Sequence, residues 1–528
     1  PDLIGEFMRR SRTGGRRARR PDGANSDGGA SGASPWGGLK GGLADPFVSR
    51  LPPYDILDEG GVEAIHETSM RLLETVGIDF RNDPETLALW AQAGAQVNGD
   101  NVKIDRNLAL DLVAKAPETF VQHARNPARS VTFGTNHMVF APVFASPNVW
   151  DLDGVRREAR LADFHDFLKL TQMASSLNHG GAQICEPMDI AATRRHLEVI
   201  YGHLTYSDKP FLGDPRGGGR AQDSLRMCEI VFGRDVVEKN VVLLSLVTAA
   251  SPLLWDATML AQLRFYAANG QALIITPFVM QGANTPVTMA GALAQLNAEA
   301  IAGIALAQLV RPGTPVIYGV SLATASMKSG APQYGTSEVA RMTYVIGQLA
   351  RRYKLPMRVG GGRNGAMLSD ATAGAQNVMT MLPAIQAQAN YIIHSAGWLE
   401  SSMAASFAQF IIDLDQLAIL QDFAQGIDVT DEALAFEAIS QTKPGGDFFS
   451  SSHTLRHYKE IFVQPMIDMG GNYEAWRDAG SEDVTHKALK LARAALDAYE
   501  PPPTDPAIDA ELRAYIERRN HELPDIET

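Results

Sequence analysis

The sequence predicts an α/β protein, a (β/α)8 TIM barrel with an N-terminal helical extension and additional C-terminal helices. Eight short apolar runs recur along the middle of the chain, and each is followed by a longer stretch with a helical pattern. Runs such as VVLLSLV and ALIIT are apolar at nearly every position, as in strands of a parallel sheet covered on both faces. Eight strand and helix units in succession predict a barrel. A doubly wound open sheet with an extra domain is the alternative.

Four regions are predicted along the chain. Residues 1–45 hold the basic cluster MRRSRTGGRRARR and then little but Gly, Ser and Ala, so we expect disorder there, and PDLIGEF before Met8 looks vector-derived. Residues 46–135 form a helical region, in which Asp83 and Pro84 are typical of a helix start and Gly94 of a helix end. Residues 136–427 form the barrel. Residues 428–528 add helices that we expect to pack on it.

The eight predicted strands are short and evenly distributed. They cover residues 138–144, 180–185, 209–214, 240–248, 272–280, 315–321, 356–362 and 390–396. Helical patterns follow them, for example at 161–174, 193–205, 256–268, 289–310 and 338–353.

Composition excludes several classes of protein. The net charge is −13, and the one basic cluster lies outside the predicted fold, which argues against a nucleic-acid binder. Two cysteines, Cys185 and Cys228, are too few for a disulfide framework or a Cys-rich zinc site. No apolar run is convincing as a membrane span, and no apolar segment follows the Arg pairs as an export signal requires. We therefore expect a cytoplasmic protein.

Aromatic and charged residues follow several of the predicted strands. In a barrel these carboxyl ends meet at one mouth, where the active site lies. The candidates for substrate binding are Phe144, Trp150, Glu186, Phe278, Arg363 and Trp398, and the candidates for catalysis are His394 and Glu400. Aromatic faces attract a ligand cation, while an arginine or a histidine can hold a carboxylate, so a betaine would suit such a mouth.

Each candidate also has a plain structural interpretation. A histidine that ends an apolar strand is often a hydrogen-bonded core residue, Trp398 is as typical of packing as of recognition, and Glu400 is also typical of a loop cap or ion pair. HTLRH places His453 and His457 on one helical face, but it lacks the Glu of a metalloprotease motif, so we expect a structural role there and no metal.

Four segments in order give a resemblance to a known family. They are LLETVGIDF…LALWAQAGAQV…AKAPETF, YGVSLATASMKSGAPQYGTSE, NYIIHSAGWLES and KPGGDFFSSSHTLRHYKE. Together they resemble the trimethylamine methyltransferase superfamily, the corrinoid-dependent methylamine methyltransferases. The resemblance implies a (β/α)8 barrel that passes a methyl group from an amine to the Co(I) of a separate corrinoid protein. Trimethylamine-specific members use pyrrolysine, which this chain lacks, so the chain is similar to the glycine betaine type.

The resemblance and the residues together give a specific expectation. The substrate is a quaternary amine, glycine betaine or a related betaine, and the cofactor is a corrinoid on a partner protein. Phe144, Trp150, Phe278 and Trp398 are the candidate cage rings, His394 would bind the carboxylate or orient the amine, and Glu400 or Glu186 would support the cationic head. We also expect a homo-oligomer.

Three other functions are left open. The first is a trimethylamine:corrinoid methyltransferase, and the second is a barrel that binds a quaternary amine or a corrinoid protein without turnover. The third is an aldolase or lyase that uses Lys328, which lies in the loop after the sixth predicted strand.

Overall fold

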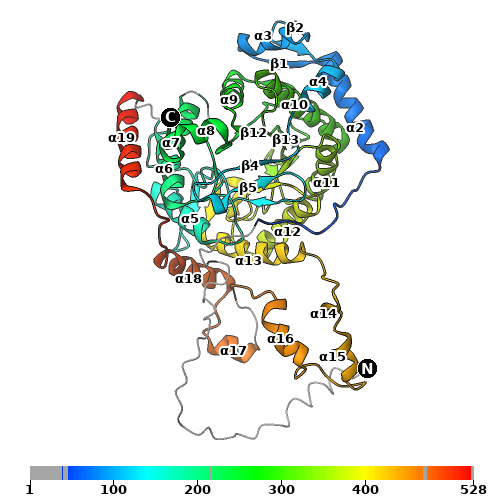
Figure 1. Ribbon diagram of the computed structural model, residues 1–528, viewed down its shortest axis with the longest axis vertical. Helices are drawn as coiled ribbons and strands as arrows, with labels where there is room; N and C mark the ends of the chain where they lie inside the picture. Colours follow the sequence, from blue (N-terminus) through cyan, green and yellow to red (C-terminus); the bar gives the residue numbers. More distant parts are fainter. Residues whose placement is uncertain (1–38, 40–45, 215–216, 218, 468–471, 525–528) are drawn as a thin grey trace. The chain divides into compact units, whose positions relative to one another are not determined.

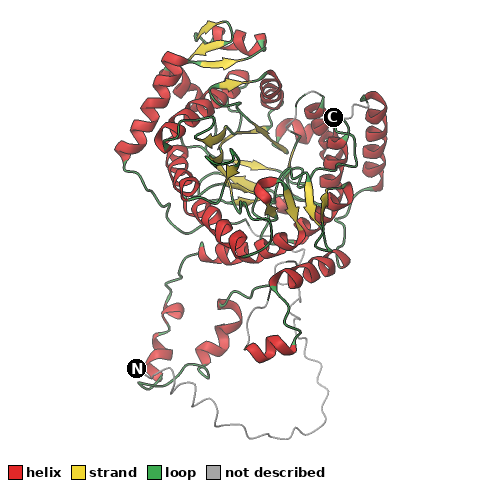
Figure 2. Cartoon of the chain, turned by 180° about the vertical axis from the view of Figure 1, so that it is seen from behind, coloured by secondary structure: helices red, strands yellow, loops and turns green. Residues whose placement is uncertain are grey.

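Seven parallel strands form the central sheet of the computed structural model, which describes residues 39, 46–214, 217, 219–467 and 472–524 (Figures 1 and 2). Their order in the sheet is β6 (Val139–Phe140), β18 (Tyr391–Ile393), β17 (Met357–Gly360), β14 (Val316–Gly319), β12 (Ala272–Ile275), β10 (Leu243–Val247) and β9 (Phe211–Leu212). Each lies within a predicted run. All of the predicted tail 1–45 except the buried Leu39 lies outside the described residues.

The sheet curls, because its two edges share one interior. Val139 of β6 and Leu212 of β9, at opposite edges, belong to the same buried cluster as Leu244, Ile274 and Ile317 of the central strands. A hairpin of β4 (Phe120–Gln122) and β5 (Val131–Phe133) adds Phe120 and Phe133 to that cluster, and Gln122 is bridged to Val241 just before β10. The hairpin therefore covers the interior at the amino ends of the strands. The hairpin does not cover the carboxyl ends of these strands, so a functional site can form there.

The prediction of a strand at residues 180–185 is wrong, because the segment forms no strand and has only an isolated parallel bridge between Cys185 and Ser146. It nevertheless lies between the two edge strands. Gly180 N donates to Pro210 O at 2.8 Å and Leu212 N to Gly181 O at 2.8 Å on one side, while Ala145 N donates to Gln183 O at 2.7 Å on the other. Gly181 has a φ of +73°, outside the extended region, and this breaks the strand.

Eight helices surround the sheet (Figure 2). They are α5 (Leu161–Met173), α6 (Arg195–Tyr206), α7 (Arg220–Phe232), α9 (Ala257–Ala268), α10 (Met289–Val310), α11 (Ser337–Arg352), α12 (Ala371–Gln386) and α13 (Phe407–Phe423). The side chains of Asp256, Thr336, Asp370 and Ser406 each accept a hydrogen bond from a backbone N–H in the first turn of α9, α11, α12 and α13. These caps fix where the chain turns from loop to helix.

Helix α10 is the most apolar of these helices. Among the described residues it alone is long and apolar enough to cross a membrane, and 89% of its apolar window is buried within the protein. Its neighbours are α9 and the N-terminal helices α2 (Glu59–Arg71) and α4 (Arg106–Val113). A helix that is apolar on all sides is expected where other helices cover every face.

The N-terminal region combines helices with a small mixed sheet. Besides α2 and α4 it contains α3 (Pro84–Gln92), which begins at the predicted cap Asp83. Strands β1 (Ile78–Phe80), β2 (Gln96–Asn98) and β3 (Asn101–Lys103) form a sheet with β11 (Leu254–Trp255). Three-residue strands have too few positions to show an alternating pattern, so the sequence did not indicate them.

The C-terminal helices divide into two groups. Helix α18 (Val484–Asp497) packs on α13 and α5, and α19 (Pro506–Glu522) packs on α6 and α7. In contrast α14 (Asp431–Leu434), α15 (Phe436–Gln441), α16 (Ser452–Ile461) and α17 (Tyr473–Asp478) contain no buried residue.

Candidate active site at the carboxyl ends of the strands

His394 lies directly after β18, at the carboxyl end of the sheet. Its φ is +65°, an uncommon conformation for a non-glycine residue, and its ring contacts Trp398 edge to face with 4.4 Å between centroids. The ring is buried, and no hydrogen-bond partner for Nδ1 is present in the described chain. Burial, together with the charges of Arg358 and Arg363, lowers the pKa of His394 well below its usual value. The imidazole is therefore neutral at physiological pH.

Two buried arginines lie beside this histidine. Arg358 is in β17 in register with Tyr391, so its side chain points into the interior of the sheet, where Nη1 donates to Val320 O at 2.5 Å. Arg363 follows β17, and its Nη1 donates to Leu322 O at 3.0 Å. Its guanidinium lies 4.9 Å from the centroid of the Tyr334 ring.

Gly360 makes room for the Arg363 side chain. A Cβ at this position would lie 2.4 Å from the Arg363 Nε and 2.7 Å from its Cζ. The guanidinium is thus folded back over the end of β17 toward the interior, and any larger residue at 360 would displace it.

Within the described residues, neither guanidinium has an acidic partner. No carboxylate of the described residues forms an ion pair with Arg358 or Arg363, and the Nε of each has no hydrogen-bond partner there. Burial lowers the pKa of Arg358 to about 9, helped by the charge of Arg363, and lowers the pKa of Arg363 to about 10. Buried charges in proteins are normally paired, so this pair of cations has the chemistry to hold an anion.

A hydrogen-bond network joins the loops after β17 and β18. Asn364 Nδ2 donates to Trp398 O at 2.7 Å and to Asn377 Oδ1 at 2.8 Å, and the Trp398 indole N–H donates back to Asn364 O at 2.9 Å. Asn377 donates at 2.6 Å to Asp413, which also accepts from Gly397 N at 2.8 Å. Burial raises the pKa of Asp413 to about 7. This network fixes Trp398 and the turn that follows His394.

Glu400 belongs to a different group of contacts. Its Oε1 accepts from the Trp150 indole N–H at 2.8 Å, and both its oxygens accept from Arg156 Nε at 3.0 Å. Glu400, Ser401 and Ser402 all have positive φ values, so the backbone is strained in this turn. The two predicted residues Trp150 and Glu400 therefore meet, but they meet as a salt-bridged cluster with Arg156.

Phe144 and Glu186 lie together in a third place. With Asp214 and neighbouring residues they line a hollow of 60 Å³, and Arg195 Nη1 donates to Glu186 at 2.9 Å. Phe278 begins β13 (Phe278–Gln281), which pairs with β15 (Ser321–Ala325). Among the described residues no ring contact joins Phe144, Trp150 and Phe278 to one another or to Trp398. The four predicted rings therefore lie on four different segments and do not form a cage in this structure.

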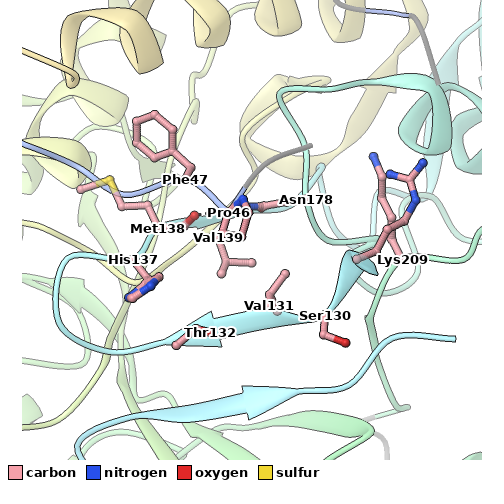
Figure 3. A pocket seen from close by; sticks show the side chains of 11 residues that line it. Pro46, Phe47, Ser130, Val131, Thr132, His137, Met138, Val139, Asn178 and Lys209 are labelled. Atoms are coloured by element: carbon pink, nitrogen blue, oxygen red, sulfur yellow. Dashed lines mark hydrogen bonds between the residues drawn. The ribbon is translucent and has the colours of Figure 1, made fainter. Parts of the chain in front are cut away.

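The pocket in Figure 3 lies at the other end of the sheet. Its lining includes Val131 and Thr132 of β5, Val139 of β6 and the buried Lys209, and its volume is 20 Å³. Lys209 Nζ already donates to three backbone carbonyls, at 2.6 to 2.8 Å. Because the Lys209 ammonium already donates all three of its hydrogen bonds, we interpret this pocket as a structural feature of the amino ends of the strands.

Lys328 and the pair His453 and His457 fall outside the site. Lys328 is exposed in the loop after β15, whereas a lysine that forms a Schiff base is normally desolvated. His457 Nε2 bonds to Glu432 Oε1 at 2.8 Å, but Arg456 donates to the same oxygen at 2.8 Å. Because the Glu432 carboxylate already pairs with Arg456, this cluster is better explained as an ion pair than as a metal site.

The sequence predicts His394, Trp398 and Arg363 as site residues, and the structure places these three near one another, but three neighbouring residues were not predicted. Arg358 stands inside the apolar run PMRVGGG, and an arginine within a strand covered on both faces is itself a signal. Tyr334 lies just after β16 (Pro332–Gln333), and Asp413 lies on α13, far from any predicted strand end. Nothing in the sequence places those two near His394.

Comparison with known proteins identifies the family. The model of the family "Trimethylamine methyltransferase (MTTB)" matches residues 13–524. The glycine betaine methyltransferase of Desulfitobacterium hafniense strain Y51 is 38% identical over 474 residues, 90% of this chain and 98% of that protein. The proline betaine:corrinoid methyltransferase of Eubacterium limosum is 28% identical, over 84% of this chain and 94% of that protein.

Other matches carry related names. Trimethylamine methyltransferase MttB of Methanosarcina barkeri is 28% identical, over 87% of this chain and 93% of that protein. The crystal structure of the Methanosarcina barkeri monomethylamine methyltransferase superposes with a TM-score of 0.43 at 10% identity, over 85% of this chain and 96% of that one. The family match spans nearly the whole described chain, and this protein therefore belongs to the trimethylamine methyltransferase family.

Proposed function

We propose that this methyltransferase takes a methyl group from a small betaine, glycine betaine or a relative of it, and passes it to the Co(I) of a corrinoid protein. Two relatives are named for betaines, and one of these is the 38% identical protein. The observation that carries the proposal is the pair Arg358 and Arg363, two buried guanidiniums without an acidic partner in the described chain. A betaine carboxylate is the anion that such a pair can hold.

The substrate carboxylate pairs with the guanidiniums, which offer several N–H donors in a planar arrangement. His394 Nδ1, which has no partner within the described chain, supplies a further polar contact to the carboxylate or orients the amine. The cationic head then lies against Trp398, whose ring contacts both His394 and Tyr334, the ring beside the Arg363 guanidinium. Phe144, Trp150 and Phe278 complete the cage if their loops close on the ligand, with Glu186 or Glu400 beside the head.

The reaction needs little from acid or base groups. A quaternary nitrogen leaves as a neutral amine when its methyl group is removed, so no proton has to be delivered to it. A neutral His394 and a Glu400 already bonded to Arg156 suit such a reaction. The corrinoid, carried by the partner protein, supplies the Co(I) nucleophile. This chain has to bind the betaine, direct one methyl group outward and exclude water.

We also infer that the sheet closes into an eight-membered (β/α)8 barrel through residues 179–186. Backbone bonds run from this segment to Pro210 and Leu212 on one side and to Ala145 on the other, which is the position of a missing strand. We propose residues 136–427 as the extent of this barrel. We also propose that the protein is cytoplasmic.

The test is methyl transfer with purified protein and reduced cobalamin. Glycine betaine should give methylcobalamin, measured by absorbance, and an equal amount of dimethylglycine. Trimethylamine has no carboxylate to meet the arginines and should give neither product. Failure of glycine betaine and of every other betaine tried would refute the proposal. Saturable binding of glycine betaine without loss of Co(I) would instead identify a non-catalytic binding protein.

A further inference from the structure

An arm of residues 427–465 leaves the body of the protein after α13 and returns to the same helix. At its far end Met466 N donates to the carboxylate of Asp415 in α13 at 2.6 Å. The arm contains α14, α15 and α16 (Figure 1), and not one of its residues is buried. A segment of this length with no core is uncommon in a compact protein and is normally functional or covered by something else.

The surface of the arm is apolar to an unusual degree. Phe449 is 85% exposed and Ile427 91% exposed. The other exposed large apolar residues of the arm are Val429, Leu434, Phe436, Ile439, Phe448, Leu455, Tyr458, Ile461 and Phe462. On α16, Leu455, Tyr458 and Ile461 recur at three-residue steps and share one face of the helix.

An apolar hollow lies on the same surface. It has a volume of 460 Å³, and its lining is Phe448, Phe449, Thr454, Leu455, Tyr458 and Phe462. Five of these six residues are aromatic or aliphatic, so the hollow fits an apolar side chain from another molecule. Such a site in water is unfavourable unless it is filled.

The exposed area matches one side of a stable interface. A buried aromatic side chain accounts for about 150–250 Å², so the aromatic and aliphatic residues of the arm together leave on the order of 1,000 Å² of apolar surface in water. The largest apolar patch of an ordinary monomer is about 300–600 Å², whereas each partner in a standard protein interface contributes about 800 Å².

We propose that the arm docks on a second copy of this chain, so that two copies cover each other's arms across a two-fold axis. Permanent homodimer interfaces are apolar and resemble a core divided between two chains, whereas a partner that must leave after each turnover meets a more polar surface. The ionic contacts of the arm are internal: Glu432 is bonded to Arg456 and His457. The arm also carries exposed charged residues beside its apolar face, among them Asp431, Lys443 and Glu460. An apolar patch with charged residues around it has the composition of an interface core and its polar rim. This inference is independent of the reaction proposed above.

The experiment is sedimentation velocity of the full chain at a series of concentrations, with Phe449→Asp and Leu455→Asp as variants. Wild-type protein should sediment as a dimer, and each variant should weaken dimerisation at least about 100-fold, because a buried unpaired aspartate is strongly unfavourable. Val287→Asp is the matched control, since Val287 is 69% exposed but lies outside the arm. It should leave the dimer intact.

Hydrogen exchange of the wild-type protein provides a measurement that needs no variant. Amides of 427–465 should be protected at concentrations that give the dimer and should lose that protection on dilution. A wild-type monomer at micromolar concentration, or a dimer unaffected by both arm substitutions, would overturn the proposal. A monomer whose arm variants lose binding to a corrinoid protein would overturn it as well and assign the arm to that partner.

Discussion

Arg363→Met separates a binding role from a structural role, because the two predict opposite changes in stability. The pKa of Arg363 is lowered to about 10 by burial. One pKa unit corresponds to about 1.4 kcal/mol, so keeping this cation buried without an anion costs roughly 3 kcal/mol of stability. Methionine keeps most of the volume and removes the charge, at the expense of the bond to Leu322 O and the contact with Tyr334. We therefore expect the substrate-free variant to be as stable as wild type or more stable.

The same substitution should damage catalysis. Losing a charge-assisted contact to the substrate carboxylate corresponds to about 3 kcal/mol, or roughly 100-fold in kcat/KM for glycine betaine. The assay is methylation of reduced cobalamin, with thermal unfolding measured in the presence and absence of glycine betaine. The stabilisation by glycine betaine should disappear in the variant.

Arg519→Met is the control for this experiment. Arg519 is an arginine with a buried acidic partner, Asp223, at 2.7 Å. Removing it leaves that carboxylate with less compensation and should lower stability while leaving the KM for glycine betaine unchanged. If Arg363→Met keeps the wild-type kcat/KM, or destabilises the protein as Arg519→Met does, the carboxylate-binding role is wrong.

Three more substitutions or pH series test the site. Since the pKa of His394 is far below its usual value, His394 should contribute no inflection to kcat/KM for glycine betaine between about pH 6 and 8, and an inflection that His394→Gln abolishes would contradict this. Gly360→Ala should displace the Arg363 guanidinium and raise the KM for glycine betaine, whereas Gly374→Ala, where a Cβ meets no atom within 4 Å, should not change it. The pKa of Asp413 is raised to about 7 in the folded protein, so its proton-linked contribution is present below about pH 4 and is lost as the pH rises through about 7. In urea denaturation, the free energy of unfolding of wild type minus that of Asp413→Asn should fall over that range, and a constant difference would refute it.

The sequence predicts the strands of the central sheet because their pattern is a local property. Strands such as Ala272–Ile275 are apolar at every position and are covered on both faces. The segment 180–185, GGAQIC, is also made mostly of small and apolar residues, but its backbone is set by Gly181, whose positive φ no hydrophobic pattern reports. The segment still bonds to both edge strands. The sequence pattern thus predicts that residues 180–185 lie between the two edge strands, but it does not predict their backbone conformation.

The site was partly predictable, for a related reason. His394 and Arg363 follow strands, and the carboxyl ends of parallel strands always share one edge. Which side chains then meet depends on loop paths, and these brought Trp150 to Glu400 and Arg156 instead of to Trp398. Arg358 lies within a strand and not after it, so the rule that sites form beyond strand ends does not find it, although its residue type is unusual for its position.

The apolar face of α16 in the arm is the third feature to compare with the sequence prediction. The sequence predicts helices in residues 428–528 that pack on the barrel, and α16 does form there, with Leu455, Tyr458 and Ile461 on one face. A periodic apolar pattern indicates that one face of a helix will be covered, but it does not indicate whether the same chain or another molecule covers that face. In this chain the face is exposed.

The unpaired arginines also bear on how the enzyme selects its substrate. A protein that buries two cations without anions is less stable than its packing alone would allow, and only a ligand with a negative charge restores the balance. Trimethylamine would bind with the guanidiniums still unmatched, and its own positive charge when protonated would add repulsion. In the proposed binding mode, selection against a simple amine would come from the guanidiniums that it leaves unpaired as much as from the attraction of the site for the betaine, as in sites that reject an analogue lacking one polar group. On this argument, replacing both Arg358 and Arg363 by methionine should reduce the preference for glycine betaine over trimethylamine in binding measurements, even where neither amine is turned over.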